Sequence, residues 1–250
     1  MKAEKNQRQV VIPGEVIVSG EDYLPGEWTE KKGNDIVARL YGLAEEQNKL
    51  VKIIPLSGVY EARRGNVIIG RVENLTFNGW IIDIGSAMSG FLSVAEVPRY
   101  VNKNDIAEVM DIGDMVVAKV WSVKRKGIDL SLKSRGLGKL EGGMIIKINS
   151  KKVPRVIGKE GSMVSLIKEK TNCNITVGQN GFIWIKGDKI EDELLVKKAI
   201  LFVTENSFSS GDMNEDDKFK FIKELDEEVV KYNSDIKELR DVKENDIMTV

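Results

Sequence analysis

The sequence contains no histidine, which removes the commonest general base and the commonest metal ligand of proteins. We therefore expect neither an enzyme nor a metal site, and the sequence indicates no cofactor. Only one cysteine is present, which excludes a disulfide framework and fits a reducing compartment, so a cytoplasmic location is expected. This residue, Cys173, falls in a strand pattern, which predicts a buried and unreactive thiol.

Long apolar runs are also missing. No segment reaches the length of a membrane span, and the basic N-terminus lacks the apolar core of a signal peptide, so no membrane association is expected. With 250 residues and 42% hydrophobic content, the chain can form two or three small domains. The net charge of −1 is unevenly distributed: residues 138–208 carry 12 Lys/Arg and 8 Asp/Glu, whereas residues 209–250 carry 7 and 13.

Within the basic segment, Gly158 and Gly161 form a G-x-x-G turn that is followed by a helical pattern. Glycine lets a phosphodiester backbone approach closely, and the N-terminus of the next helix favours an anion. A connector between two helices uses glycines in the same way, and this alternative stays open for the motif alone. Four cations, Lys151, Lys152, Arg155 and Lys159, lie within nine residues of the turn, where a phosphate would lie.

The surroundings of the turn favour RNA binding. The patterns predict strands at Met144–Ile148, Cys173–Val177 and Phe182–Lys186 and helices at Val153–Ile157 and Ile190–Phe208. The order β-α-GxxG-α-β-β-α resembles a type I KH domain, which clamps the backbone of single-stranded nucleic acid. We therefore assign residues 138–208 to a KH domain whose predicted RNA-binding residues are Lys151, Lys152, Arg155, Gly158, Lys159, Glu160 and Gly161.

Residues 66–137 read as five short strands with a helical or irregular insert between the third and the fourth, which predicts an OB barrel. Such barrels stack bases on exposed aromatic side chains beside basic residues. Phe77 and Trp80 are the stacking candidates, and since they lie three apart, at least one should be exposed. Core packing is the alternative for each, and Phe91 is assigned to the core. Phosphate contacts are predicted for Lys124, Arg125 and Lys126.

The same segment resembles the RNA-binding OB domain named after ribosomal protein S1. The motifs that carry this resemblance are Gly65-x-Val67, Gly70-x-Val72, Phe77–Gly85, Gly90-Phe91-Leu92, Gly113-Asp114-x-Val116 and Ile128-x-Leu130-Ser131-Leu132. Many members carry a histidine shortly after the third strand. Here Ser93 stands in its place, so one nucleic-acid contact typical of the family is missing or replaced.

Residues 1–65 are predicted to be a small, turn-rich β domain without a catalytic constellation, with an irregular loop from Gly20 to Gly33 and a separator from Gly42 to Asn48. Together with the OB and KH segments, this block resembles the KH-containing RNA-binding cap subunits of the RNA exosome, most closely the archaeal form. The resemblance implies three copies of the chain on a hexameric ring of RNase PH-like subunits. It also implies that the β domain docks on the ring and that single-stranded RNA enters a central channel.

The C-terminal segment, residues 209–250, is predicted to contain one helix from Asp217 to Tyr232 followed by a disordered acidic tail. Two other functions remain open beside the cap. A stand-alone single-stranded RNA-binding regulator or translation-associated protein could use the same two modules. An enzyme would need a metal site such as Asp216-Asp217 or Glu227-Glu228, but adjacent carboxylates on a charged helix are typical of a solvated surface.

Overall fold

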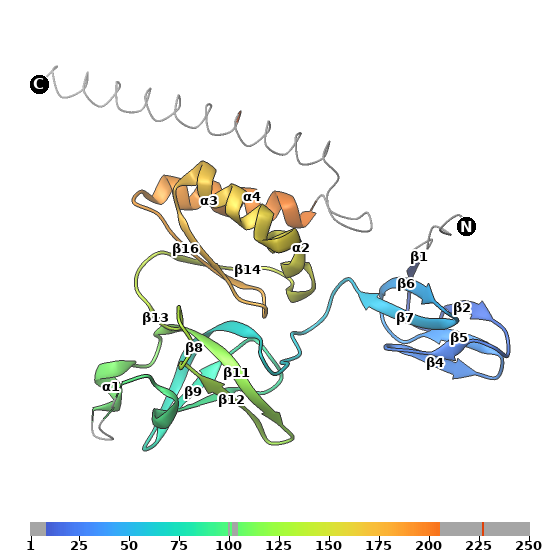
Figure 1. The fold of residues 1–250 in the computed structure, drawn as a ribbon, viewed down its shortest axis with the longest axis horizontal. Helices are drawn as coiled ribbons and strands as arrows, with labels where there is room; N and C mark the ends of the chain where they lie inside the picture. Colours follow the sequence, from blue (N-terminus) through green and yellow to red (C-terminus); the bar gives the residue numbers. More distant parts are fainter. Residues whose placement is uncertain (1–8, 100, 102–104, 206–226, 228–250) are drawn as a thin grey trace, which may run out of the picture.

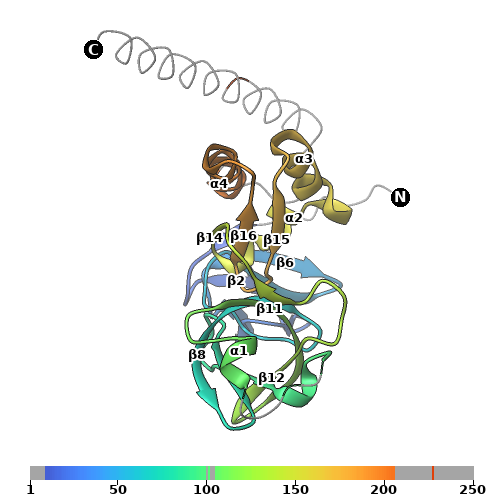
Figure 2. The same cartoon turned by 90° about the vertical axis from the view of Figure 1, so that its left-hand side faces the viewer.

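A computed structural model describes residues 9–99, 101, 105–205 and 227. Figure 1 shows an N-terminal β domain to one side, joined by one extended segment to a β-barrel that lies beneath the KH domain. In Figures 1 and 2 alike, the KH sheet lies between the KH helices and the barrel. Both predicted RNA-binding modules therefore sit together, apart from the N-terminal domain.

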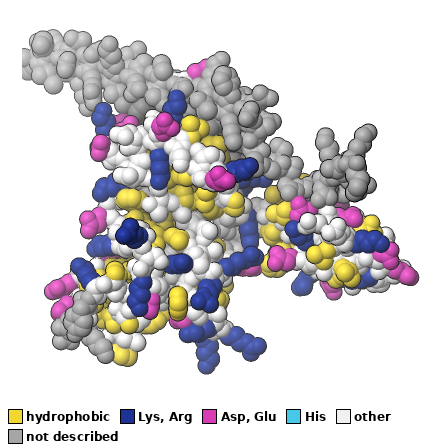
Figure 3. All heavy atoms as spheres, viewed as in Figure 1, with side chains coloured by type: hydrophobic (Ala, Val, Ile, Leu, Met, Phe, Trp, Pro, Cys, Tyr) yellow, Lys and Arg dark blue, Asp and Glu magenta, His cyan; other side chains and the backbone are white. Residues whose placement is uncertain are grey.

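The N-terminal domain consists of two small sheets, with strand orders β1-β6-β7-β3 and β2-β5-β4. Its strands are β1 (Gln9–Val11), β2 (Val16–Ser19), β3 (Leu24–Pro25), β4 (Thr29–Lys32), β5 (Asp35–Ala38), β6 (Gly42–Gln47) and β7 (Leu50–Pro55). The prediction of an irregular loop over residues 20–33 is wrong, since β3 and β4 lie there, and the expected separator is β6. The strands β3 and β4 lack an alternation of apolar and polar residues. Pairing with distant strands, rather than a local sequence pattern, therefore stabilises them. Hydrophobic side chains are visible on this domain in Figure 3.

The barrel is formed by five strands, as predicted, and closes where β11 pairs with β12. The strands are β8 (Val67–Thr76), β9 (Gly79–Asp83), β10 (Gly90–Ser93), β11 (Met115–Lys124) and β12 (Gly127–Ser131). The short helices η1 (Val94–Glu96) and α1 (Ile106–Val109) form the insert between the third and fourth strands. A further strand, β13 (Gly138–Leu140), pairs with β11, so the first residues of the segment assigned to the KH domain belong to the barrel sheet.

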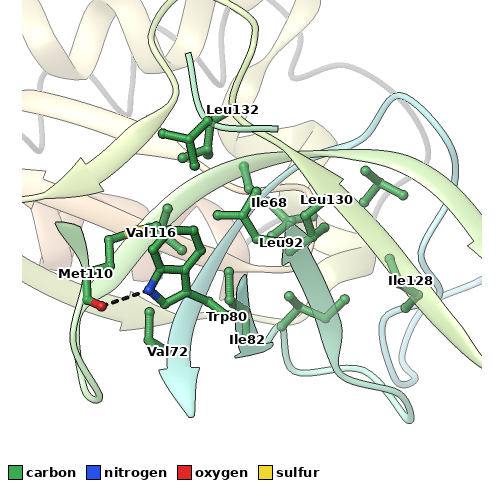
Figure 4. Packing of buried hydrophobic residues seen from close by; sticks show 14 of the residues in the cluster. Ile68, Val72, Trp80, Ile82, Leu92, Met110, Val116, Ile128, Leu130 and Leu132 are labelled. Atoms are coloured by element: carbon green, nitrogen blue, oxygen red, sulfur yellow. Dashed lines mark hydrogen bonds between the residues drawn. The ribbon is translucent and has the colours of Figure 1, made fainter. Parts of the chain in front are cut away.

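The barrel core surrounds the fully buried side chain of Trp80 (Figure 4). Ile68, Ile82, Leu92 and Leu130 belong to the same cluster, and each contributes about 1.5–3 kcal/mol through burial. Tyr60 also belongs to this core, although the sequence places it in the N-terminal domain. Its hydroxyl donates a hydrogen bond of 2.9 Å to Asn66 Oδ1, and burial raises the pKa of Tyr60 to about 12. The segment that enters the barrel is therefore part of the barrel fold.

The KH domain has the predicted type I order, with an antiparallel sheet of order β14-β16-β15. Its elements are β14 (Met144–Lys147), η2 (Ser150–Lys152), α2 (Val153–Ile157), η3 (Lys159–Gly161), α3 (Ser162–Thr171), β15 (Asn174–Val177), β16 (Phe182–Lys186) and α4 (Ile190–Glu205). Ile183 and Ile185 face the helices, because alternate side chains of a strand point to one face. Cys173 is buried in the same core, and burial raises its thiol pKa, in agreement with the predicted unreactive thiol.

The predicted C-terminal helix and acidic tail lie outside the described residues, of which only Glu227 falls beyond residue 205. The same holds for the end of the helix that was expected to reach Phe208. None of the helices in the described part of the chain is long and apolar enough to cross a membrane.

Candidate RNA-binding surfaces

The glycine turn contains a position, Gly158, that has no room for a side chain. Helix α2 ends at Gly158, which has φ 72° and ψ 175° and whose N–H donates a 2.9 Å bond to the carbonyl of Pro154. A Cβ on Gly158 would lie 2.7 Å from the backbone nitrogen of Met163, so no larger residue fits without movement. Gly161 has φ 82°, also in the left-handed region. The turn therefore brings a bare backbone to the N-terminus of α3, where an anion is favoured.

Lys159 and Glu160, two of the predicted RNA-binding residues, form the exposed tip of this turn. Glu160 has φ 54° and ψ 26°, a left-handed conformation that is uncommon for a residue with a side chain. Backbone strain of this kind gathers at ligand-binding sites, where the surrounding structure holds it in place. Lys159 provides the cation beside the turn, and the Glu160 carboxylate reduces the local positive charge.

The three other predicted cations have different environments. Nζ of Lys152 donates a 2.7 Å hydrogen bond to the carbonyl of Thr204, near the C-terminal end of α4. A cation at a helix C-terminus stabilises the helix dipole, so the structure gives Lys152 a contact at the end of α4. Arg155 is half-buried on α2, and burial lowers the pKa of its guanidinium below the usual value, although arginine stays charged at neutral pH. Lys151 is half-buried in η2.

On the barrel, the two stacking candidates separate. Phe77 lies in the β8–β9 turn with 78% of its surface exposed, whereas Trp80 has none exposed. The indole Nε1 of Trp80 donates a 2.8 Å bond to the carbonyl of Met110, inside the core (Figure 4). The prediction that at least one of the pair is exposed is confirmed, and the assignment of Trp80 to the RNA-binding surface is wrong. Alternate residues of an extended segment point to the same face, and Trp80, Ile82 and Ile84 all face the core.

Phe91 and Ser93 lie on β10, close to the same end of the barrel. Phe91 is half-buried and is not a member of the buried core cluster, which corrects its assignment to the core. Ser93 pairs in register with Gly79, next to the β8–β9 turn. Its Oγ accepts a 3.3 Å hydrogen bond from the N–H of Ala95, so the serine caps η1 at the position where many relatives carry a histidine.

The predicted basic residues of the β11–β12 turn and Phe77 lie toward opposite ends of the barrel strands. Along β11, Met115 is paired with Arg71 of β8, and from there the two strands run in opposite directions toward the basic turn and toward Phe77. Arg125 and Lys126 are exposed at the turn. Lys124 Nζ lies 2.6 Å from Asp129 Oδ2, in an ion pair that is exposed to solvent.

Sequence reasoning missed an aromatic residue close to this basic turn. Trp121 on β11 is 55% exposed, and the guanidinium carbon of Arg64 lies 5.1 Å from its ring centroid. The available signal was an indole only three residues before three consecutive cations, within a strand whose inward positions are Val116, Ala118 and Val120.

The KH hairpin between β15 and β16 is anchored in the barrel. Asn180 is 2% exposed, and its Nδ2 donates to the carbonyls of Ile69 (2.6 Å) and Ile84 (2.8 Å) while its Oδ1 accepts from Ile69 N–H (3.2 Å). Gln179 adds two bonds to Val67: the backbone N–H of Gln179 donates to the Val67 carbonyl (2.9 Å), and its Oε1 accepts from the Val67 N–H (3.0 Å). This contact holds the two modules in one orientation.

No set of three or more Cys, Asp or Glu side chains within the described part of the chain is arranged to hold a metal ion. The paired carboxylates considered for a metal site, at 216–217 and 227–228, lie outside the described residues except for Glu227.

The fold and these surfaces define a multidomain RNA-binding protein. Residues 61–133 match the family described as the S1 RNA binding domain, and residues 143–191 match the family described as the KH domain. The chain also resembles a crystal structure reported for an exosome complex RNA-binding protein, with a TM-score of 0.60 and 32% identity over 68% of this chain and 97% of the other.

Proteins named exosome complex component Rrp4 show a similarity that covers 82% of the chain. The protein from Methanobrevibacter smithii is 42% identical over 205 residues, which is 68% of its length. Identity is 40% to the proteins of Methanothermobacter thermautotrophicus and Methanothermus fervidus, of whose lengths 66% and 91% are covered. This chain belongs to the Rrp4 family of exosome components. It is a non-catalytic RNA-binding protein, as the absence of histidine led us to expect.

Proposed function

We propose that this protein forms the RNA-binding cap of an exosome, where it captures single-stranded RNA and guides it into the central channel of a phosphorolytic ring. Three copies would sit on a hexamer of RNase PH-like subunits in the cytoplasm. The observation that carries this proposal is the combination, in one chain of the Rrp4 family, of an S1 and a KH module with an N-terminal domain of different surface character.

The N-terminal domain has the surface of a protein-docking module. Among the described residues, 16 large hydrophobic side chains are exposed, and 8 of them lie between residues 10 and 59. These eight are Val10, Ile12, Val16, Leu24, Tyr41, Leu50, Ile54 and Val59. Exposed apolar side chains gathered on a small domain indicate a protein interface.

Strand register places part of this set on one sheet face. Leu24 of β3 pairs with Leu50 of β7, and Leu50 shares the outward alternation of β7 with Ile54. Val10 of β1 and Ile54 are both paired with Leu43 of β6. Because register partners point to the same face, Val10, Ile54, Leu50 and Leu24 line the outer side of the sheet β1-β6-β7-β3. This face is the surface that we propose to dock on the ring.

The proposal is tested by mixing the purified chain with the hexameric ring and measuring mass by light scattering. We expect an assembly with three copies of the chain per hexamer, and faster degradation of RNA with a single-stranded 3′ end than by the ring alone. The chain without the ring, supplied with Mg²⁺ and phosphate, should leave labelled RNA intact. A chain that binds RNA but never associates with the ring would instead be a stand-alone RNA-binding protein.

A further inference from the structure

Trp121 lies at an irregularity of strand β11, and its indole is exposed. The register between β11 and β12 shifts between Val120 and Ser122, so that Trp121 is the additional residue of a β-bulge. Bulges redirect side chains and occur often beside functional sites. More than half of the Trp121 surface, 55%, is exposed, whereas Trp80 is fully buried and its indole donates to the carbonyl of Met110.

Arg64 is held against the ring of Trp121 by the backbone on its C-terminal side. The N–H of Gly65 donates to the carbonyl of Val120, and the N–H of Val120 donates to the carbonyl of Asn66, both at 2.8 Å. These two bonds fix the segment next to Trp121, and the guanidinium carbon then lies 5.1 Å from the ring centroid. A guanidinium at this distance over an indole ring is attracted to it, so the pair places a positive charge beside an exposed aromatic ring.

The charge around this pair is positive. Residues 61–67 and 119–129 together contain six Lys/Arg and two Asp/Glu, and one of the two acids, Asp129, is paired with Lys124 at 2.6 Å. The other acid, Glu61, is exposed. Lys and Arg side chains project from the lower edge of the barrel in Figure 3. A docking surface for a protein is expected to be depleted in charge at its centre, whereas a flat aromatic ring among cations suits bases joined by phosphates.

We propose that Trp121 and Arg64 form a second stacking site for a base of single-stranded RNA, with Arg125 and Lys126 contacting the flanking phosphates. This proposal rests on the proposed RNA-binding function and adds a site that is separate from Phe77. The two aromatic residues lie toward opposite ends of β8, whose ten residues extend over about 30 Å. An RNA strand that reaches both sites would therefore have to span about the length of β8.

The test is the affinity of the full chain for a fluorescently labelled, unstructured RNA. Trp121→Ala should weaken binding about 5- to 150-fold, the range for loss of one stacked base, whereas Trp121→Phe should retain most of the affinity. Arg64→Ala should weaken binding more than Arg64→Lys, because lysine keeps the charge and loses the planar stack. Val123→Ala is the matched control: Val123 is an exposed apolar residue of the same strand, 43% accessible, without a ring. Each variant should melt within a few degrees of the wild type.

Photocrosslinking with 4-thiouridine RNA provides a second measurement, and crosslinks are expected at Trp121 as well as at Phe77. If Trp121→Ala binds RNA like Val123→Ala while Phe77→Ala binds more weakly, the second site does not exist and the proposed RNA-binding function stands. If the wild-type chain binds no RNA, the proposed function itself fails. If Trp121→Ala leaves RNA binding intact but loses association with the ring, the surface binds protein and our inference is overturned.

Discussion

At the scale of single residues, the contrast between Phe77 and Trp80 separates binding from stability. Phe77→Ala removes an exposed ring, so we expect RNA affinity to fall by about 1–3 kcal/mol at an unchanged melting temperature. Trp80→Ala empties a fully buried position and leaves the carbonyl of Met110 without its donor, and should destabilise the barrel by about 3–5 kcal/mol. Urea unfolding and RNA titration of both variants test this. Unchanged affinity in a stable Phe77→Ala protein would remove Phe77 from the RNA-binding surface.

Tyr60 connects a single buried group to the pH dependence of stability. Burial raises its pKa in the folded chain to about 12, from 10.0 for an unperturbed tyrosine. Between these values the unfolded chain loses the phenolic proton while the folded chain keeps it, so the free energy of unfolding falls as pH rises from 10 to 12. Over this interval the free energy of unfolding falls by about 2 kcal/mol. Comparing urea unfolding at both ends of this range, we expect a smaller fall for Tyr60→Phe; an equal fall would contradict the buried phenol.

At the scale of elements, the contact of the KH hairpin with the barrel should couple the unfolding of the two domains. Asn180→Ala leaves the buried backbone groups of Ile69 and the carbonyl of Ile84 without partners, which should cost at least about 1–3 kcal/mol. Gln179→Ala is the control, because Gln179 is exposed and keeps its backbone bond to Val67. In calorimetry, Asn180→Ala should separate the melting of barrel and KH domain into two steps. Melting identical to that of the wild type would show that this contact does not couple them.

The glycine turn is tested by a change of charge at its tip. Replacing Lys159 and Glu160 with aspartate keeps Gly158 and Gly161, so stability should change by no more than about 0.5 kcal/mol. Two carboxylates there repel a phosphate. We expect lower RNA affinity and a salt dependence whose logarithmic slope is shallower by about 0.7, the value for one lost contact to a single strand. Identical affinity and slope would mean that the turn only connects two helices and that the barrel binds RNA alone.

At the scale of the whole molecule, assembly and RNA binding should be separable by truncation. Tyr60 belongs to the barrel core, so the N-terminal domain should be removed by a truncation that ends after β7. Deletion of residues 1–56 should preserve the barrel, whereas deletion of residues 1–65 would remove Tyr60 from its core. The shortened chain should bind RNA and fail to join the ring, as measured by co-elution. As a control without truncation, Leu24→Asp with Leu50→Asp should have the same effect, since it charges the proposed docking face. Co-elution of either protein with the ring would place the docking surface elsewhere.

The chain order of the three domains could be predicted from the sequence because its signals are local. Strand alternation in Phe182–Lys186, the apolar periodicity of α4 and the glycines at 158 and 161 each follow from a few neighbouring residues. The element order of the KH domain then agrees with the predicted type I order, whereas the register of its strands was not predicted. The weakly patterned strands β3 and β4 escaped prediction, because distant partners rather than local propensity stabilise them.

Which of the predicted RNA-binding side chains reach the surface, in contrast, was decided by the tertiary structure. Trp80 and Trp121 are the same residue type in strands of the same barrel, yet alternation turns the first into the core and a bulge turns the second outward. Lys152 is one of four cations near the glycine turn, but the end of α4 gives it a partner. In the sequence, Asn180 is an ordinary turn asparagine, and only the structure shows that it is bonded to the barrel. Residue type determines what a side chain can bind, and only the packing of distant segments determines which groups it reaches.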